Sequence, residues 1–107
     1  MGGGPAVNDP RFPGATILAF EGTLPRIADS AFIAPGARII GDVEIGPEAS
    51  IWYNCVLRGD IHRIVVGPRS NVQDGTVIHV EGPRPETEGQ PTIIGADCLV
   101  GHMALIH

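Results

Sequence analysis

The chain contains no lysine, and its seven basic residues are all arginine. This absence excludes catalysis by a lysine amine and argues against a phosphate-binding P-loop, which needs a lysine. The formal net charge is -5 and the arginines form no stripe, which argues against nucleic acid as a partner. No apolar run approaches the roughly 20 residues of a membrane span, and the N-terminus lacks a charged and apolar secretory leader. We therefore expect a cytoplasmic protein that contacts neither nucleic acid nor membrane.

Aromatic residues and cysteines are also scarce: one Trp, one Tyr, three Phe and two Cys in 107 residues. Few aromatics suit an interior filled by stacked Ile and Val. Cys55 and Cys98 form no C-x-x-C pair, which disfavours redox catalysis and a cysteine metal site. We expect both to be buried free thiols. By contrast, 15 Gly and 10 Pro are too many for a helical protein, and the length predicts one domain with a modest core.

From Ile33 onward an aliphatic residue returns at every sixth position, with two insertions that interrupt the period. These anchors are Ile33, Ile39, Ile45, Ile51, Leu57, Val66, Val72, Ile78, Ile94, Val100 and Ile106. Small or short side chains recur four positions later, at Ala37, Val43, Ala49, Cys55, Ser70, Thr76, Cys98 and Ala104. This hexapeptide pattern is typical of a parallel β-helix, in which each repeat forms one face of a triangular coil. The sequence therefore predicts an all-β, single-stranded β-helix with coils roughly 4.8 Å apart.

The domain organisation follows from where this period holds. Residues 1–14 are rich in Gly and Pro, and we expect a flexible N-terminal segment there. Residues 15–107 would form the β-helix domain. The polar stretch Glu81–Gln90 breaks the period, which predicts an excursion loop at residues 80–92.

Three histidines occupy informative positions in this repeat. His79 and His107 each follow an anchor and lie 28 residues apart, which is one 18-residue coil plus a ten-residue excursion. A lone histidine there is more often a surface or capping residue, but two in one slot, with His102 close by, favour a metal site. Three histidines and one open position form the arrangement of catalytic zinc. His102 lies near another corner of the coil, too far round for its imidazole to reach the same ion easily. If β-helices packed about a threefold axis, a neighbouring chain could supply this ligand; the spacing allows this packing but does not require it.

Three stretches of the chain resemble the gamma-class carbonic anhydrase family. They are residues 52–60 (WYNCVLRGD), 71–79 (NVQDGTVIH) and 95–107 (GADCLVGHMALIH). The resemblance covers roughly residues 20–107 and implies a left-handed β-helix that assembles as a homotrimer with metal sites at subunit interfaces. It further implies that His79 and His107 of one chain and His102 of its neighbour bind Zn²⁺, or Fe²⁺ or Co²⁺ as in some members.

The same resemblance implies an activity and further roles. The implied reaction is reversible hydration of carbon dioxide to bicarbonate by a metal-bound hydroxide, because zinc lowers the pKa of bound water to about 7. Arg58 and Asp60 would form an ion pair across the interface, and Asn71 and Gln73 would position the metal-bound solvent. The residues suit these roles, since Arg58 and Asp60 point to the same side of an extended chain and Gln73 both donates and accepts. His62 is expected to be a surface residue.

Two departures from the family pattern keep alternatives open. Ile61 stands where fast members carry a glutamate, and none of Glu81, Glu86 and Glu88 matches a loop glutamate securely. The family continues after His107 with further coils and a C-terminal helix, so we expect a truncated form that lacks them. One alternative is a non-catalytic relative that keeps the metal site for binding or assembly. The other is a hexapeptide acyltransferase, which uses a histidine base on the same fold.

Overall fold

The computed structural model describes residues 9–79 and 91–106. Within these residues the regular structure is entirely β, and every ladder that joins two of the strands is parallel. The strands wind into stacked coils with three faces, so the prediction of an all-β parallel β-helix is confirmed. None of the described residues belongs to a helix long and apolar enough to cross a membrane.

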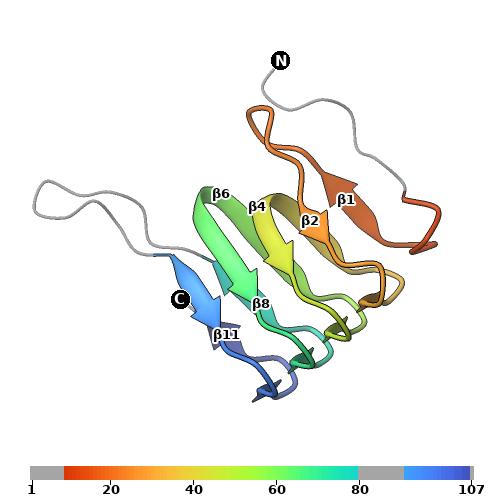
Figure 1. The fold of residues 1–107 in the computed structure, drawn as a ribbon, viewed down its shortest axis with the longest axis vertical. Helices are drawn as coiled ribbons and strands as arrows, with labels where there is room; N and C mark the ends of the chain where they lie inside the picture. Colours follow the sequence, from red (N-terminus) through yellow and green to blue (C-terminus); the bar gives the residue numbers. More distant parts are fainter. Residues whose placement is uncertain (1–8, 80–90, 107) are drawn as a thin grey trace, which may run out of the picture.

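The coils stack from β1 at one end to β11 at the other (Figure 1). The first face comprises β1 (Thr16–Leu18), the first half of β4 (Arg38–Ile45) and of β6 (Val56–Val66), β8 (Val77–His79) and β11 (Leu105–Ile106). The second face comprises β2 (Arg26–Ile27), the second halves of β4 and β6, and β9 (Thr92–Ile94). The third face comprises β3 (Phe32–Ile33), β5 (Ser50–Ile51), β7 (Asn71–Val72) and β10 (Leu99–Val100). Because β4 and β6 continue around a corner, the first two faces form one sheet.

The predicted anchors form the core. They stack in register, so that Ile39 pairs with Leu57, Leu57 with Ile78, and Ile78 with Ile106. The anchors from Ile33 to Ile78 are at most 1% exposed. Burying one such side chain contributes about 1.5–3 kcal/mol, so the stacked anchors dominate the stability of the coils.

The small inward slots are buried from Ala37 to Thr76, whereas Cys98 and Ala104 in the last described coil are half-buried. Thr76 is fully buried, and its hydroxyl donates to the carbonyl of Gly101 at 2.7 Å. Burial raises the pKa of the Cys55 thiol. Cys98, however, is half-buried, so the prediction of two buried thiols is wrong for this residue. Cys55 is stacked between two coils, whereas the described residues place a coil on only one side of Cys98.

The insertion before Val66 hides an additional core residue. Ile64 pairs with Val43 and is fully buried, so a large aliphatic fills a slot that elsewhere holds a small side chain. The strict six-residue count missed it, because the insertion shifts the register between Gly41 and Val43.

Two of the corners are stacks of left-handed residues. Gly36, Asn54, Gly75 and Met103 have positive φ where the third face meets the first. Glu48, Arg69 and Asp97 have positive φ, near +60°, where the second face meets the third. This conformation costs residues other than glycine about 1–2 kcal/mol, so the tight turns are maintained by the coils that flank them.

The first described residues, from Asp9 onward, pack against the core of the β-helix. Phe12 is buried against the first coil, and Arg11 bonds to Asp9 and Asp29. The first strand begins at Thr16, and Ile17 pairs with Ile39. The predicted flexible segment, residues 1–14, and the predicted excursion loop, residues 80–92, fall mainly on residues 1–8 and 80–90, which lie outside the described residues.

Candidate functional site

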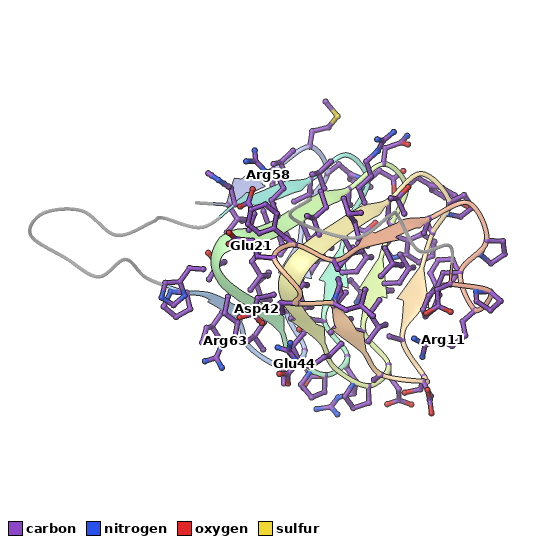
Figure 2. All side chains as sticks on the ribbon, turned by 90° about the horizontal axis from the view of Figure 1, so that it is seen from above. Arg11, Glu21, Asp42, Glu44, Arg58 and Arg63 are labelled. Carbon is purple, nitrogen blue, oxygen red and sulfur yellow. The ribbon has the colours of Figure 1, made fainter. Side chains whose placement is uncertain are left out.

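The predicted site residues Arg58 and Asp60 lie where β6 bends between the first and second faces. Gly59 makes this bend possible, because a Cβ at this position would lie 2.4 Å from the carbonyl oxygen of Asp42 on β4. Arg58 donates from Nη2 to Oδ2 of Asp60 at 3.0 Å, so the two residues form an ion pair within one chain. Figure 2 shows Arg58 on the same side of the β-helix as Glu21 and Asp42, opposite Arg11.

Asp60 is more buried than its partner. Its side chain is 18% exposed against 45% for Arg58. The second oxygen, Oδ1, is buried and has no hydrogen-bond partner among the described residues. A buried acceptor without a partner costs about 1–3 kcal/mol, so this oxygen marks a place where a further donor would bind.

His79 belongs to the same corner. It ends β8, and its Cα is the register partner of Arg58 on β6. The side chain is half-buried and its Nε2 atom is shielded from solvent. The ladder between β8 and β11 extends to Ile78 and Ile106, and His107 lies outside the described residues. We call this corner, which carries Arg58, Asp60 and His79, the arginine corner.

The remaining predicted residues lie elsewhere on the coil. Asn71 begins β7, Gln73 follows that strand, and His102 follows β10 in the next coil. The backbone N–H of Gln73 donates to Val100 at 3.0 Å, which stacks the two turns on one another. His102 is exposed. These residues lie where the third face meets the first. We call this place, which carries Asn71, Gln73 and His102, the amide corner.

The structure therefore divides the predicted site between two corners of one chain. Among residues 9–79 and 91–106, no three His, Cys, Asp or Glu side chains gather closely enough to hold a metal ion. The arginine corner supplies one described imidazole and an ion pair. The amide corner supplies the other described imidazole and two amides.

Comparison with known proteins gives the family. The profile of the bacterial transferase hexapeptide family (six repeats) matches residues 25–59. Gamma carbonic anhydrase 2, mitochondrial, of Arabidopsis thaliana is 48% identical over 83 residues, which cover 78% of this chain and 30% of that protein. A carbonic anhydrase of Geobacillus kaustophilus is 43% identical over 91 residues, covering 85% of this chain and 47% of the relative. The chain belongs to the gamma-class carbonic anhydrase family.

Solved structures agree with this family fold. A Bacillus cereus protein proposed to be an acetyltransferase superposes with a TM-score of 0.78 at 41% identity, covering 86% of this chain and 50% of that one. A hexapeptide transferase family protein of Anaplasma phagocytophilum gives a TM-score of 0.69 at 46% identity, with 78% and 45% covered. The chain thus spans half or less of the length of these curated relatives and solved structures.

The structure also shows features that the sequence did not single out in this gamma-class chain. A pocket of about 220 Å³ adjoins the arginine corner, and its lining includes Asp60, His62, Glu21 and Asp42. His62, which we expected at the surface, is half-buried there and accepts a hydrogen bond from the N–H of Arg63 at 2.8 Å. The short turn that carries Glu21 closes one side of the pocket, and no periodic signal in the sequence indicates this contact.

At the amide corner, Asn71 is tied to a serine that the repeat pattern gave no reason to select. The amide oxygen of Asn71 accepts a hydrogen bond from the hydroxyl of Ser50, its direct neighbour on β5. Trp52 in turn donates from Nε1 to Ser50 at 2.9 Å. The only signal in the sequence is the spacing of Ser50 and Trp52, which puts both on the same side of an extended chain.

Proposed function

We propose that this chain forms the hexapeptide-repeat part of an enzyme that hydrates carbon dioxide reversibly to bicarbonate at a metal site shared between two copies. Named carbonic anhydrases among its relatives support the reaction class. The observation that carries the proposal is the division of the predicted site between the arginine corner and the amide corner of one chain. Two corners that face different directions become one site only when neighbouring copies pack corner to corner.

The donor chemistry fits zinc, because neutral imidazole is a preferred zinc ligand. His79 would bind from the arginine corner. Extending the Ile78–Ile106 register by one residue would bring His107 beside it, and His102 of a second copy would provide the third imidazole. When bound, zinc supplies hydroxide at neutral pH; Fe²⁺ and Co²⁺ accept the same ligands.

The buried oxygen of Asp60 supports a contact with a second copy. Arg58 satisfies only Oδ2, and Oδ1 is left without a donor among the described residues. A guanidinium carries five N–H groups, so Arg58 of a neighbouring copy could donate to Oδ1 while keeping its own ion pair. This arrangement would give the predicted ion pair across the interface and would remove the cost of the orphaned acceptor.

The remaining residues bind and orient the substrate and product. The amides of Gln73 and Asn71 offer N–H donors to the oxygens of bicarbonate, and Gln73 also offers an acceptor. The cationic Arg58, on the facing corner, attracts bicarbonate electrostatically when this anion enters or leaves the site. Closing the two corners against each other excludes bulk water, which strengthens each of these contacts.

A second candidate function is metal binding or assembly without turnover. It is favoured by Ile61, an aliphatic residue that cannot transfer protons, at the position after Asp60. The matching profile and both solved structures carry transferase names, but the acyltransferase is the less favoured alternative, because neither the two amides nor the histidines are specific for an acyl donor. The cytoplasmic location stays a prediction; three of the relatives carry the word mitochondrial in their names.

The first test measures mass and metal content of the purified chain. We expect a trimer with about one metal ion per chain, and we expect His102→Ala to lose the metal. His62→Ala is the matched control, because it removes a histidine outside both corners and should leave the metal in place. A metal-free trimer of the unaltered chain would refute the proposal.

The second test asks whether the ligands come from different chains. His79→Ala and His102→Ala each damage every site of a homotrimer. Every mixed trimer, however, contains one interface at which both corners are intact, so refolding equal amounts together should restore about a quarter of the metal. No recovery would place the ligands within one chain. Stopped-flow hydration of carbon dioxide then separates the enzyme from the non-catalytic relative.

A further inference from the structure

Ser50 is buried although its strand position points it outward. On β5 the side chain of Ile51 fills the core, so the side chain of Ser50 must face the other way. Yet Ser50 is only 9% exposed, and the indole N–H of Trp52 donates to its hydroxyl oxygen. The hydroxyl of Ser50 is therefore shielded from water although it lies outside the apolar core. Its hydrogen bonds therefore determine what it does.

The direction of these hydrogen bonds is fixed by Trp52. An indole N–H is a donor only, so the oxygen of Ser50 must act as the acceptor in the 2.9 Å bond between them. The hydroxyl proton of Ser50 is then directed to the second partner, Oδ1 of Asn71. The relay runs from Trp52 through Ser50 to Asn71. An amide whose oxygen faces Ser50 turns its NH₂ group away from it.

The ring of Trp52 is itself held in place. It packs against Phe32, with ring centroids 5.1 Å apart and planes tilted by 55°, and against Tyr53 at 6.0 Å and 57°. Both distances fall in the range of favourable aromatic pairs. Two aromatic neighbours restrict rotation of the indole, so its N–H is aimed at Ser50 before any ligand binds. The relay is preorganised by packing.

We infer that Ser50 is a positioning residue that fixes the side-chain amide of Asn71 with its NH₂ group presented as a donor to an oxygen anion of the size of bicarbonate. The inference rests on the proposed function, which makes Asn71 part of the shared site. An amide free to rotate presents its oxygen half of the time and would repel an anion in that orientation. The relay removes this alternative, and it favours an acceptor ligand over a cation.

The chain offers a direct readout, because Trp52 is the single tryptophan and gives one indole N–H resonance. Ser50→Ala should move this resonance upfield, accelerate its exchange with solvent and weaken bicarbonate binding to the metal-loaded trimer by about three- to tenfold. Ser50→Thr, which keeps the hydroxyl, should restore all three. Ser30→Ala is the matched control, since the Ser30 hydroxyl accepts only from the N–H of Glu48 at a different corner among the described contacts.

Asn71→Asp distinguishes the hydrogen bonds of the relay from the donor that the relay presents to the anion. The carboxylate still accepts from Ser50, so the indole resonance should stay in place, but it offers no donor, so bicarbonate binding should fall by at least about tenfold. An unchanged indole resonance in Ser50→Ala would show that the relay does not exist. A shifted resonance with unchanged bicarbonate affinity would make Ser50 merely structural and overturn the inference. An unaltered chain that binds neither metal nor bicarbonate would instead refute the proposed function, and the indole and Asn71 amide resonances would still decide whether the relay exists.

Discussion

Replacing Gly59 with alanine tests why a glycine separates Arg58 from Asp60. The added Cβ would lie 2.4 Å from the carbonyl oxygen of Asp42, 2.7 Å from its carbonyl carbon and 3.0 Å from its nitrogen. Ordinary contact begins at 3.4 Å, and backbone atoms cannot rotate away, so β4 and β6 would have to separate by about 1 Å in a close-packed region. Overpacking of this kind costs typically 1–3 kcal/mol, and weakened ladder hydrogen bonds add to it. We expect a loss of about 3 kcal/mol in the free energy of unfolding.

Urea unfolding followed by the fluorescence of Trp52 measures this loss, provided that the slope of the free energy against urea is unchanged. Gly101→Ala is the control, because a Cβ there meets nothing within 4 Å and the φ of Gly101 is not positive. It should change stability by less than about 1 kcal/mol, and a slight gain is expected from the smaller entropy of the unfolded chain. Equal costs for the two variants would show that the contact between Gly59 and Asp42 does not constrain the corner.

Three further predictions concern other corners and the thiols. Glu48→Gly should raise the melting temperature by relieving a φ of 61° in an exposed turn, whereas Glu44→Gly, in strand β4, should lower it. The Arg69 guanidinium, which bonds to Asp97 at 2.7 and 2.9 Å, lowers the pKa of that carboxyl; the pair's contribution to stability should thus be present above the unfolded pKa of about 3.9 and lost as pH falls through the folded pKa. NMR titration of Asp97 in Arg69→Gln should return its pKa to the ordinary range. A thiol reagent at pH 8 should label half-buried Cys98 and leave Cys55 unlabelled until unfolding, because burial raises the pKa of Cys55; rapid labelling of both would contradict this.

The core of the fold could be predicted because its signal is local and repeated. Each anchor from Ile33 to Ile78 is followed within a few residues by the next, and each is almost completely buried. The insertion in β6 is where this reasoning failed. The count resumes at Val66, but Ile64 also enters the core, since the strand adjusts its register to its neighbour rather than to the sequence.

The sequence by itself determined the type of coil and the chemical identity of the candidate ligands, because a six-residue period and a set of histidines are properties of the chain read in order. Only the tertiary structure decided which residues share a corner. Arg58 and His79 are neighbours through the pairing of β6 with β8, although 21 residues separate them, while Gln73 lies close to His79 in sequence but on a different corner. The hydrogen bond between Ser50 and Asn71 and the contact between Gly59 and Asp42 likewise depend on distances between coils. Such distances are fixed by the stacking of the whole β-helix, which no single repeat encodes.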